Sequence, residues 1–394
     1  MIEADIAVVG AGPAGAALAL TLAPRHSVLL IDRDATPRQR IGESLIPAAR
    51  RLLHDMRILD AFEAGGFPGY FGNLSWWGGG DAHITDFLKD PDGPGWHLDR
   101  AGFETMLRAA ACSRGARLVA PGRLASIERL GGGWRLTLKT GEGGPGEQVR
   151  SRLVVDASGR SAIVAKRLGV ARRHGDRLTA CWMRGTDAEE SGVTAGFSMV
   201  ESTAGGWWYS APLPGRARVL SFHTDSDLMP PDCRAPGFLQ NAAMTLPGVG
   251  PALAATDFRS DGPATLTAAN STVLETVAGD GWLAIGDAAL SFDPLASRGL
   301  FNALYTAWSA AAACHDHLCG DADTFADYRQ DLDRIEQFYR RHLAVAYGAE
   351  NRWPDAPFWS RRRTPQVFAM ESRPAEAISP IPAKVGMSGV SANR

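Results

Sequence analysis

The feature that most constrains this chain is a glycine-rich turn between an apolar strand and a helix near the N-terminus. The apolar run Ile6–Val9 is typical of a buried parallel strand, and Ala16–Leu20 is predicted to be helical. Between them lies G-A-G-P-A-G, whose glycines are Gly10, Gly12 and Gly15. Such glycines permit a tight turn, and the helix N-terminus offers free N–H groups to a pyrophosphate. The arrangement predicts a dinucleotide-binding βαβ unit.

The second strand of this unit ends in an acidic residue. Ser27–Ile31 reads as the strand, Asp32 follows it directly, and Arg33 comes next. An acid at this place is positioned to accept hydrogen bonds from ribose hydroxyls. We therefore expect Asp32 and Arg33 to belong to a cofactor site.

Two further glycine-and-acid motifs follow buried strands later in the chain. The first is Asp156-Ala157-Ser158-Gly159-Arg160, and the second is Gly286-Asp287, which leads into Asp293-Pro294. The ordered trio is what a protein needs to hold FAD along its whole length. The residues predicted to bind the cofactor here are Asp156, Gly159, Gly286 and Asp287. The plain alternative for Asp287 is a turn or helix-capping acid.

Composition limits the classes of protein to which the chain can belong. Its 394 residues can form two domains, and a net charge of −2 gives no broad basic surface for nucleic acid. No run of about 18 apolar residues indicates a membrane span, and the chain begins directly with a strand, without a signal peptide. The five cysteines lack the spacing of a disulfide framework, which favours a reducing, cytoplasmic location.

One cluster resembles a metal site in composition only. It is the run Cys314-His315-Asp316-His317-Leu318-Cys319. On a helix, Cys319 lies about 140° from Cys314, so these side chains cannot converge on one ion. The run is predicted to be the end of a helix, and no metal is expected.

The pattern of elements predicts an α/β fold: a Rossmann-like FAD-binding domain, an antiparallel-sheet substrate domain and C-terminal helices. A discontinuous FAD-binding domain is expected at 1–177 and 276–320, with substrate-side insertions near 66–97. The substrate domain is expected at 178–275, a helical segment at 321–363 and a loosely ordered tail at 364–394. Arg361-Arg362-Arg363 reads as a solvated charge run, with contact to an acidic partner as the alternative.

Several longer motifs make the chain similar to a known superfamily. They are Gly42-Glu43-Ser44 followed by Pro47, Gly95-Trp96-His97-Leu98-Asp99-Arg100, Gly205-Gly206-Trp207-Trp208-Tyr209, Ser291-Phe292-Asp293-Pro294-Leu295 and Arg352-Trp353-Pro354. With them, the chain resembles the para-hydroxybenzoate-hydroxylase-like FAD flavoproteins over residues 4 to 363. Within that superfamily it is similar to the branch of tryptophan halogenases and their non-halogenating relatives.

The resemblance implies the remaining cofactor contacts. Arg100 would lie near the pyrophosphate or adenosine portion of FAD, and Asp287 would hold the ribityl chain. The segment 294–300 would line the isoalloxazine, with contacts from Pro294, Gly299 and Leu300. The helix after Gly299 would point its positive end at the negative charge of reduced flavin.

The resemblance also implies an electron source and an oxidant. The chain has no second glycine motif for a nicotinamide, so NAD(P)H would bind transiently or an external flavin reductase would be the donor. O2 would react at the reduced flavin, and the protein would have to exclude water until the substrate is in place.

Two departures from the halogenases of this branch disfavour halogenation. Their motif W-x-W-x-I-P is matched here by residues 207–212, in which Tyr209 and Ala211 replace Trp and Ile. Those enzymes also use a lysine between flavin and substrate. Lys89, the only lysine between Gly42 and Trp96, is flanked by acids in a predicted solvated turn.

We therefore expect an FAD-dependent monooxygenase acting on an aromatic substrate, either a small molecule or a peptidyl group. Some non-halogenating relatives hydroxylate a tryptophan side chain of a partner protein during maturation of tryptophylquinone cofactors, and residues 70–73 and 75–78 are similar to that group. One alternative is a reductase or dehydrogenase of a hydrophobic polyene or quinone, as in the geranylgeranyl-reductase-like branch. Another is a flavin-holding assembly factor that performs no chemistry.

The candidate pocket residues are aromatic. Trp76, Trp77, Trp207 and Trp208 supply apolar area for a flat substrate, with ordinary sheet core as the alternative. Because adjacent strand residues point to opposite faces, at most one of each pair can line the pocket. Arg298, beside the flavin segment, could reach flavin, substrate or solvent.

The candidate acid–base groups are Glu43, His97 and Tyr209. Glu43 could instead serve the cofactor or cap a helix, and His97 could make a structural hydrogen bond.

Overall fold

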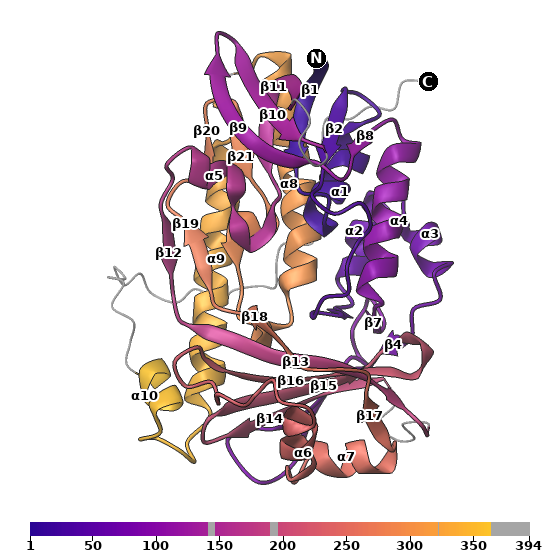
Figure 1. Ribbon diagram of the computed structural model, residues 1–394, viewed down its shortest axis with the longest axis vertical. Coiled ribbons are helices and arrows are strands. Elements are labelled where there is room, and N and C mark those ends of the chain that lie inside the picture. Colours follow the sequence, from indigo (N-terminus) through magenta and orange to yellow (C-terminus); the bar gives the residue numbers. More distant parts are fainter. Residues whose placement is uncertain (141–145, 190–195, 322, 364–394) are drawn as a thin grey trace.

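The computed structural model describes residues 1–140, 146–189, 196–321 and 323–363, so the tail expected at 364–394 lies outside the described residues. An α/β layer stands above a broad antiparallel sheet (Figure 1). Helix α9 (Ala326–Gly348) runs down one side of both, and the short helix α10 (Pro357–Arg363) lies at its lower end. The predicted fold class, α/β with an antiparallel sheet and C-terminal helices, is confirmed.

The α/β layer is organised around β1 (Ile2–Val9). It pairs in parallel with β2 (Val28–Ile31) on one side and with β11 (Glu147–Asp156) on the other. The strand order is β20-β21-β11-β1-β2-β8. The other members are β8 (Arg117–Val119), β9 (Arg123–Leu130), β10 (Gly133–Lys139), β20 (Ala278–Gly279) and β21 (Trp282–Ala284). A strand from late in the chain thus completes a sheet begun by the first.

Small residues allow the helices of this layer to pack closely. Helix α1 (Pro13–Leu22) packs against α4 (Arg100–Ser113) and against α8 (Gly299–Cys319). Four of the ten residues of α1 are alanine, and all four are buried. Alanine side chains let backbones approach, so α1 is enclosed on all sides.

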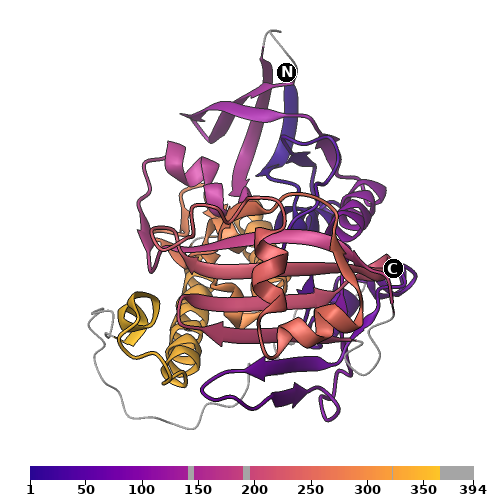
Figure 2. The same cartoon turned by 60° about the horizontal axis from the view of Figure 1, so that its bottom comes forward.

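The antiparallel sheet has the order β17-β13-β16-β15-β14-β5-β6, and among its described strands only β14 and β5 pair in parallel. Its strands are β5 (Gly72–Trp76), β6 (His83–Asp86), β13 (Leu178–Asp187), β14 (Phe197–Thr203), β15 (Gly206–Pro212), β16 (Ala217–Asp225) and β17 (Phe258–Ser260), with β18 (Thr265–Ala268) also on β13. Helices α6 (Phe238–Met244) and α7 (Val249–Ala255) cover the face turned away from the α/β layer (Figure 2). We call that face the lower face and the opposite one the upper face.

Shorter elements join the layers. One small sheet has the order β3-β7-β4 and the other β12-β19-β22. Their strands are β3 (Ser44–Leu45), β4 (Gly69–Tyr70), β7 (Gly95–His97), β12 (Arg172–His174), β19 (Thr272–Leu274) and β22 (Leu290–Ser291). The remaining helices are α2 (Ala49–Asp55), α3 (Leu59–Glu63), α5 (Ile163–Arg167), α9 (Ala326–Gly348) and α10 (Pro357–Arg363). In the described ranges, no helix combines the length and the apolar character needed to cross a bilayer.

Candidate functional site

The glycine turn after β1 forms a cradle that only glycine can build. Gly10 has φ +111°, and a Cβ atom there would lie 2.2 Å from the carbonyl oxygen of Ala157. A Cβ on Gly15 would lie 1.9 Å from the carbonyl oxygen of Gly10. A Cβ on Gly12, in contrast, would meet no atom within 4 Å, so one side of the turn is open to a ligand. The open side and the free N-terminus of α1 fit a pyrophosphate.

Asp32 is held beside this turn at the end of β2. Its Oδ2 accepts a hydrogen bond from the Ala11 amide at 2.7 Å and lies 3.1 Å from the Arg108 guanidinium. Arg108 also donates to the Ala11 carbonyl at 2.9 Å, so one buried arginine joins the turn to the acid. Arg33 extends outward and pairs with Asp34 at 3.5 Å. Arg108 was not among the predicted cofactor residues, although a charged residue on the apolar face of α4 was a readable signal.

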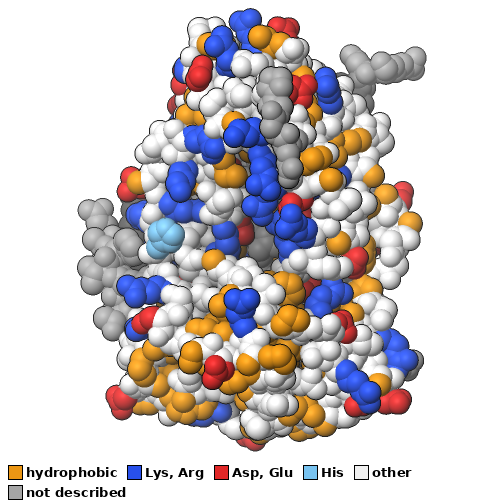
Figure 3. Space-filling model, in the orientation of Figure 1, with side chains coloured by type: hydrophobic (Ala, Val, Ile, Leu, Met, Phe, Trp, Pro, Cys, Tyr) orange, Lys and Arg blue, Asp and Glu red, His pale blue; other side chains and the backbone are white. Residues whose placement is uncertain are grey.

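Basic side chains gather around a hollow where the α/β layer meets the antiparallel sheet (Figure 3). This charge favours an anionic ligand along the junction. Arg100, predicted near the pyrophosphate, donates to the Gly42 carbonyl at 2.8 Å and to Glu104 at 2.7 Å. It therefore fixes the segment that carries Glu43.

The carboxylate of Asp156 makes hydrogen bonds to neighbouring groups of its own chain. Its carboxylate accepts hydrogen bonds from the amides of Val164 and Ala165 at 2.8 and 2.9 Å and from the Ser158 hydroxyl at 2.6 Å. These bonds cap α5 and shape the turn in which Gly159 has φ +67°. Asp156 thus supports the turn instead of offering a free oxygen to a ligand.

Two arginines absent from our predictions join that turn to the Gly286-Asp287 turn. Arg172 donates to the backbone carbonyl of Asp287 at 2.5 Å. Arg160 donates to the Phe292 carbonyl at 2.8 Å, and its guanidinium lies 3.6 Å from the Asp287 carboxylate. The Asp287 side chain remains one-third exposed. The second and third glycine-and-acid motifs are therefore one connected structure.

The segment predicted to line the flavin begins at a buried acid. Asp293 accepts hydrogen bonds from the Tyr347 hydroxyl at 2.7 Å and from the Leu295 amide at 2.9 Å. Pro294 and Gly299 are exposed, whereas Leu300 is buried. The guanidinium of Arg298 lies 5.3 Å above the ring of Phe338 on α9, and burial lowers its pKa. Arg298 is thus directed toward α9.

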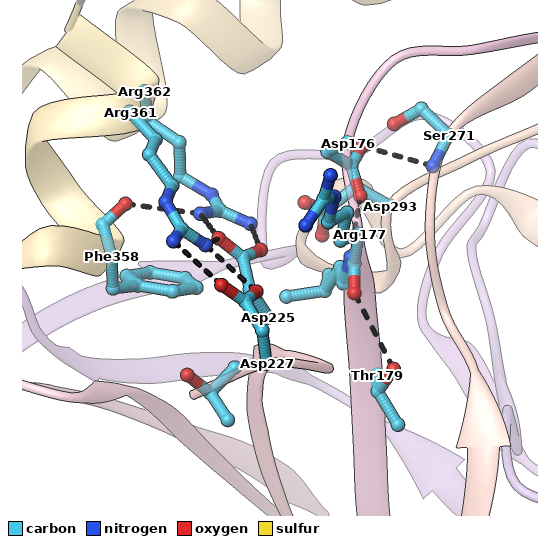
Figure 4. A network of polar contacts seen from close by, with 12 residues as sticks. Asp176, Arg177, Thr179, Asp225, Asp227, Ser271, Asp293, Phe358, Arg361 and Arg362 are labelled. Atoms are coloured by element: carbon cyan, nitrogen blue, oxygen red, sulfur yellow. Dashed lines mark hydrogen bonds and ion pairs between the residues drawn. The ribbon is translucent and has the colours of Figure 1, made fainter. Parts of the chain in front are cut away.

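The C-terminal arginines do not form a solvated run, which corrects that expectation. Arg361 pairs with Asp225 and Asp227 at 2.9 and 2.7 Å, and Arg362 pairs with Asp225 at 2.7 Å (Figure 4). A hollow of about 340 Å³ lies among these pairs beside Asp176. The pairs fasten α10 to the end of β16.

Two of the three candidate acid–base groups, His97 and Tyr209, contact one hydroxyl, that of Ser44. The Ser44 Oγ atom lies 2.8 Å from the Tyr209 hydroxyl and 3.5 Å from Nδ1 of His97. Ser198 on β14 lies 3.3 Å from the same Tyr209 hydroxyl. Glu43 precedes Ser44 and is fully buried, and β3 itself contacts α8. The structure thus brings Glu43, His97 and Tyr209 into one buried group beside α8.

Burial sets the charge state of this group. It raises the pKa of Glu43 to about 7 and lowers that of His97 to about 4. Burial and the neighbouring Glu43 raise the pKa of Tyr209 to about 12. At neutral pH the histidine is therefore uncharged, the phenol is protonated, and the carboxyl is poised to gain or lose a proton. Oε1 of Glu43 and Nε2 of His97 are buried without a hydrogen-bond partner.

The tryptophan pairs separate as strand alternation requires. Trp208 and Trp76 pack into the lower face under α6 and α7. Trp207 is on the upper face, stacked on His223 at 3.7 Å with its Nε1 3.1 Å from the Tyr347 hydroxyl. Trp77 also packs beside α9 and α10. The expectation that Trp76 and Trp208 line a pocket is therefore wrong, because their face is covered by helices.

An upper-face row that we did not predict lies beside the acid–base group. Ser221 of β16 is directly opposite Trp182 on β13 and Tyr209 on β15. The Ser221 hydroxyl is buried without a partner, as are both ring nitrogens of His223. Trp182 is fixed by a hydrogen bond of 2.9 Å from Nε1 to Thr267. The signal was the two-residue period of these strands, but it could be used only after their pairing was known.

No group of three or more His, Cys, Asp or Glu side chains in the described part of the chain is arranged to hold a metal ion. Cys314 is buried in the core and Cys319 is exposed at the end of α8.

Comparisons with known proteins agree with this geometry. The sequence profile of a family described as "FAD binding domain" matches residues 3–325. LodB of Marinomonas mediterranea, which carries the name FAD-dependent oxidoreductase, is 32% identical over 374 residues, covering 91% of this chain and 96% of its own. The structure of CmlS, a flavin-dependent halogenase, superposes with a TM-score of 0.80 at 25% identity and covers 92% of this chain and 68% of its own. The fold of the peptidyl tryptophan dihydroxylase QhpG is also alike, with a TM-score of 0.74 at 22% identity, over 94% and 81% of the two chains.

Proposed function

This chain belongs to the FAD-binding-domain family and is an FAD-dependent oxidoreductase, and from that premise we propose that it hydroxylates a tryptophan side chain of a partner polypeptide. The observation that carries the proposal is the upper-face row Trp182–Ser221–Tyr209, which meets a buried acid–base group at Ser44. The likeness to QhpG in fold and the departures from the halogenase motif support the same chemistry.

The residues present fit FAD, as the open glycine cradle shows. Those proposed to hold it are Gly10, Gly12, Gly15, Asp32, Arg33, Arg100, Gly159, Gly286, Asp287, Pro294, Gly299 and Leu300. When bound, FAD supplies the electrons that activate O2. NAD(P)H, bound transiently, or an external flavin reductase is the proposed source of those electrons.

The row on the sheet recognises an aromatic ring. Trp182 and Tyr209 lie on the two strands that flank Ser221, so their rings rise on either side of a small hydroxyl-bearing residue. Neighbouring strands are about 4.8 Å apart, which places these two side chains about 10 Å apart. Both aromatic tips are fixed by hydrogen bonds, Trp182 to Thr267 and Tyr209 to Ser44. Ser221 would hydrogen-bond a polar atom of the ring, such as the indole N–H.

The acid–base group moves a proton next to this row. Tyr209 holds a proton at its hydroxyl, because its pKa is about 12, and Ser44 connects it to the rest of the group. Glu43, with a pKa of about 7, is the member that exchanges protons near neutral pH. His97 stays neutral and orients Ser44. Exclusion of water from this buried group preserves these roles.

The test is isotope incorporation. Protein loaded with FAD, with NADH and a flavin reductase, would be incubated under ¹⁸O2 with a tryptophan-bearing peptide, and the peptide mass would be measured. We expect ¹⁸O to enter the tryptophan. Halogen incorporation when bromide is present would contradict the proposal. So would anaerobic reduction of a quinone without any oxygen transfer, which would favour the reductase alternative.

The Tyr209→Phe variant tests the site. It removes only the hydroxyl, so we expect ¹⁸O incorporation to fall at least about 100-fold, the usual scale for a lost acid–base group. Flavin absorbance and the melting temperature should be nearly unchanged, because the ring remains. Full activity of this variant would remove Tyr209 from the chemistry.

A further inference from the structure

The hairpin β5–β6 leaves one edge of the antiparallel sheet open. β6 is the last strand in the order, and no strand in the described residues pairs with its outer edge. All four of its residues are exposed. Figure 2 shows the hairpin projecting beside β14 at the margin of the sheet. An open edge presents unpaired N–H and C=O groups, which proteins usually protect.

Apolar side chains stand at this same edge. Ile84 is 63% exposed and Leu88 is 86% exposed, which is unusual for residues of this size. Ile84 lies directly opposite Leu74, and cross-strand neighbours share a face, so Ile84 extends the apolar lower face beyond its last covered strand. An added strand would cover it.

The charge around β6 selects the kind of partner. Asp81 and Asp86 are exposed and Asp90 is half-buried, against the single cation Lys89. A second copy of this chain pairing through its own β6 would bring these acids together, which costs free energy. A segment with alternating apolar and basic residues would instead complement both the exposed side chains and the acids.

The edge is continuous with the proposed site. β5 pairs with β14, where Asn73 lies opposite Ser198, and Ser198 contacts the Tyr209 hydroxyl. Asn73 also accepts a hydrogen bond of 2.8 Å from Tyr70, which stacks against His97. A strand added outside β6 would lie four strand spacings, about 19 Å, from β15. About six extended residues span that distance.

We propose that β6 binds an extended, apolar and basic segment of the substrate polypeptide by strand addition, so that a tryptophan about six residues away reaches Tyr209. This inference rests on the proposed function, since it names the part of a polypeptide substrate that docks. Main-chain hydrogen bonds would supply the affinity, while Ile84 and Leu88 would choose the side chains.

The probe is a fluorescein-labelled peptide of about 15 residues, with alternating valine and lysine and one tryptophan. Fluorescence anisotropy would measure its binding to the FAD-loaded protein. We expect the double variant Ile84→Ser, Leu88→Ser to bind it at least about 10-fold more weakly. A peptide of the same sequence, N-methylated at alternate amides, should also bind at least about 10-fold more weakly. The control is Leu266→Ser on β18, because Leu266 is 42% exposed and β18 pairs with β13, on the side of the sheet opposite the hairpin.

Unchanged binding by the double variant, or equal binding of the N-methylated peptide, would overturn the proposal. A concentration-dependent dimer that the double variant abolishes would also overturn it, in favour of self-pairing. A second measurement distinguishes failure of the docking proposal from failure of the proposed function. It is ¹⁸O incorporation into N-acetyltryptophanamide, which is too short to pair with β6. If the double variant loses peptide binding but still transfers oxygen fully to N-acetyltryptophanamide, the role of β6 in docking is supported. Oxygen transfer to neither substrate by the parent protein overturns the proposed function and with it the assignment of the docked segment.

Discussion

The two faces of the antiparallel sheet differ in how completely their polar groups are satisfied. On the lower face, Arg218 and Asp187 form a buried pair at 2.9 Å, and Glu201 caps α7 through the Val249 amide at 2.8 Å. On the upper face, the Ser221 hydroxyl and both nitrogens of His223 are buried without partners. Unpartnered buried polar atoms cost free energy that a protein retains only for a reason. The lower face is therefore built for folding, and the upper face for a ligand.

We expect the greatest loss of stability from a change on the lower face. Asp187→Ala removes the carboxylate that pairs with the buried Arg218 guanidinium, so we expect the free energy of unfolding to fall by about 3–5 kcal/mol in urea denaturation. The matched control is Asp257→Ala, whose partner Arg259 is exposed, and its effect should be at most about 1 kcal/mol. Similar small losses for both variants would contradict the role of the lower face in folding.

The next effect concerns the buried carboxyl above the upper face. Native Glu43 keeps its proton up to about pH 7, whereas the unfolded chain releases it near 4.5, so its contribution to stability is full below 4.5 and lost as pH rises through 7. The change is about 3 kcal/mol. Glu43→Gln should remove this slope. The unfolding free energies of parent and variant would be measured from pH 4.5 to 8 and subtracted. The subtraction removes the contribution of Asp293, whose pKa burial also raises to about 7. A difference that stays constant with pH would contradict the assignment.

Two serines on opposite faces of the sheet should give the smallest changes. Ser221→Ala removes a hydroxyl that has no partner, so stability should change by less than about 1 kcal/mol, while KM for the tryptophan peptide rises up to about 10-fold. Ser210→Ala, on the lower face, loses a bond to Arg218 and should cost about 1 kcal/mol with KM unchanged. Identical behaviour of the two serines would show that the faces do not divide folding from binding.

Local patterns predicted the elements of the α/β layer well. Ile6–Val9 and Ser27–Ile31 fall within or beside β1 and β2, and the glycine turn lies between β1 and α1 as expected. These features depend on neighbours in sequence, so periodicity and turn chemistry suffice to find them. The alternation rule also stated that each tryptophan pair would divide between faces.

Which tryptophan faces which layer could not be read from the sequence. That choice depends on α6 and α7, which follow Trp76 and Trp208 at a distance and cover them. The same limit applies to Arg172, whose partner Asp287 is 115 residues away. Trp182 was missed because only the register of three strands puts it beside Ser221 and Tyr209. Long-range pairing, more than residue type, decides the composition of the site.

Because β21 and α8 come late in the sequence, the α/β layer can be completed only late in synthesis. On the ribosome, the glycine turn emerges first, but α1 lacks its neighbour α8 until residues after Gly299 have been synthesised. At about 5–20 residues per second, that interval is about 15–60 s. During it the nascent chain has a half-built cofactor cradle and an antiparallel sheet that folds as an insertion. The synthesis of α8, and not of the first βαβ unit, therefore sets the earliest moment at which the complete cradle exists.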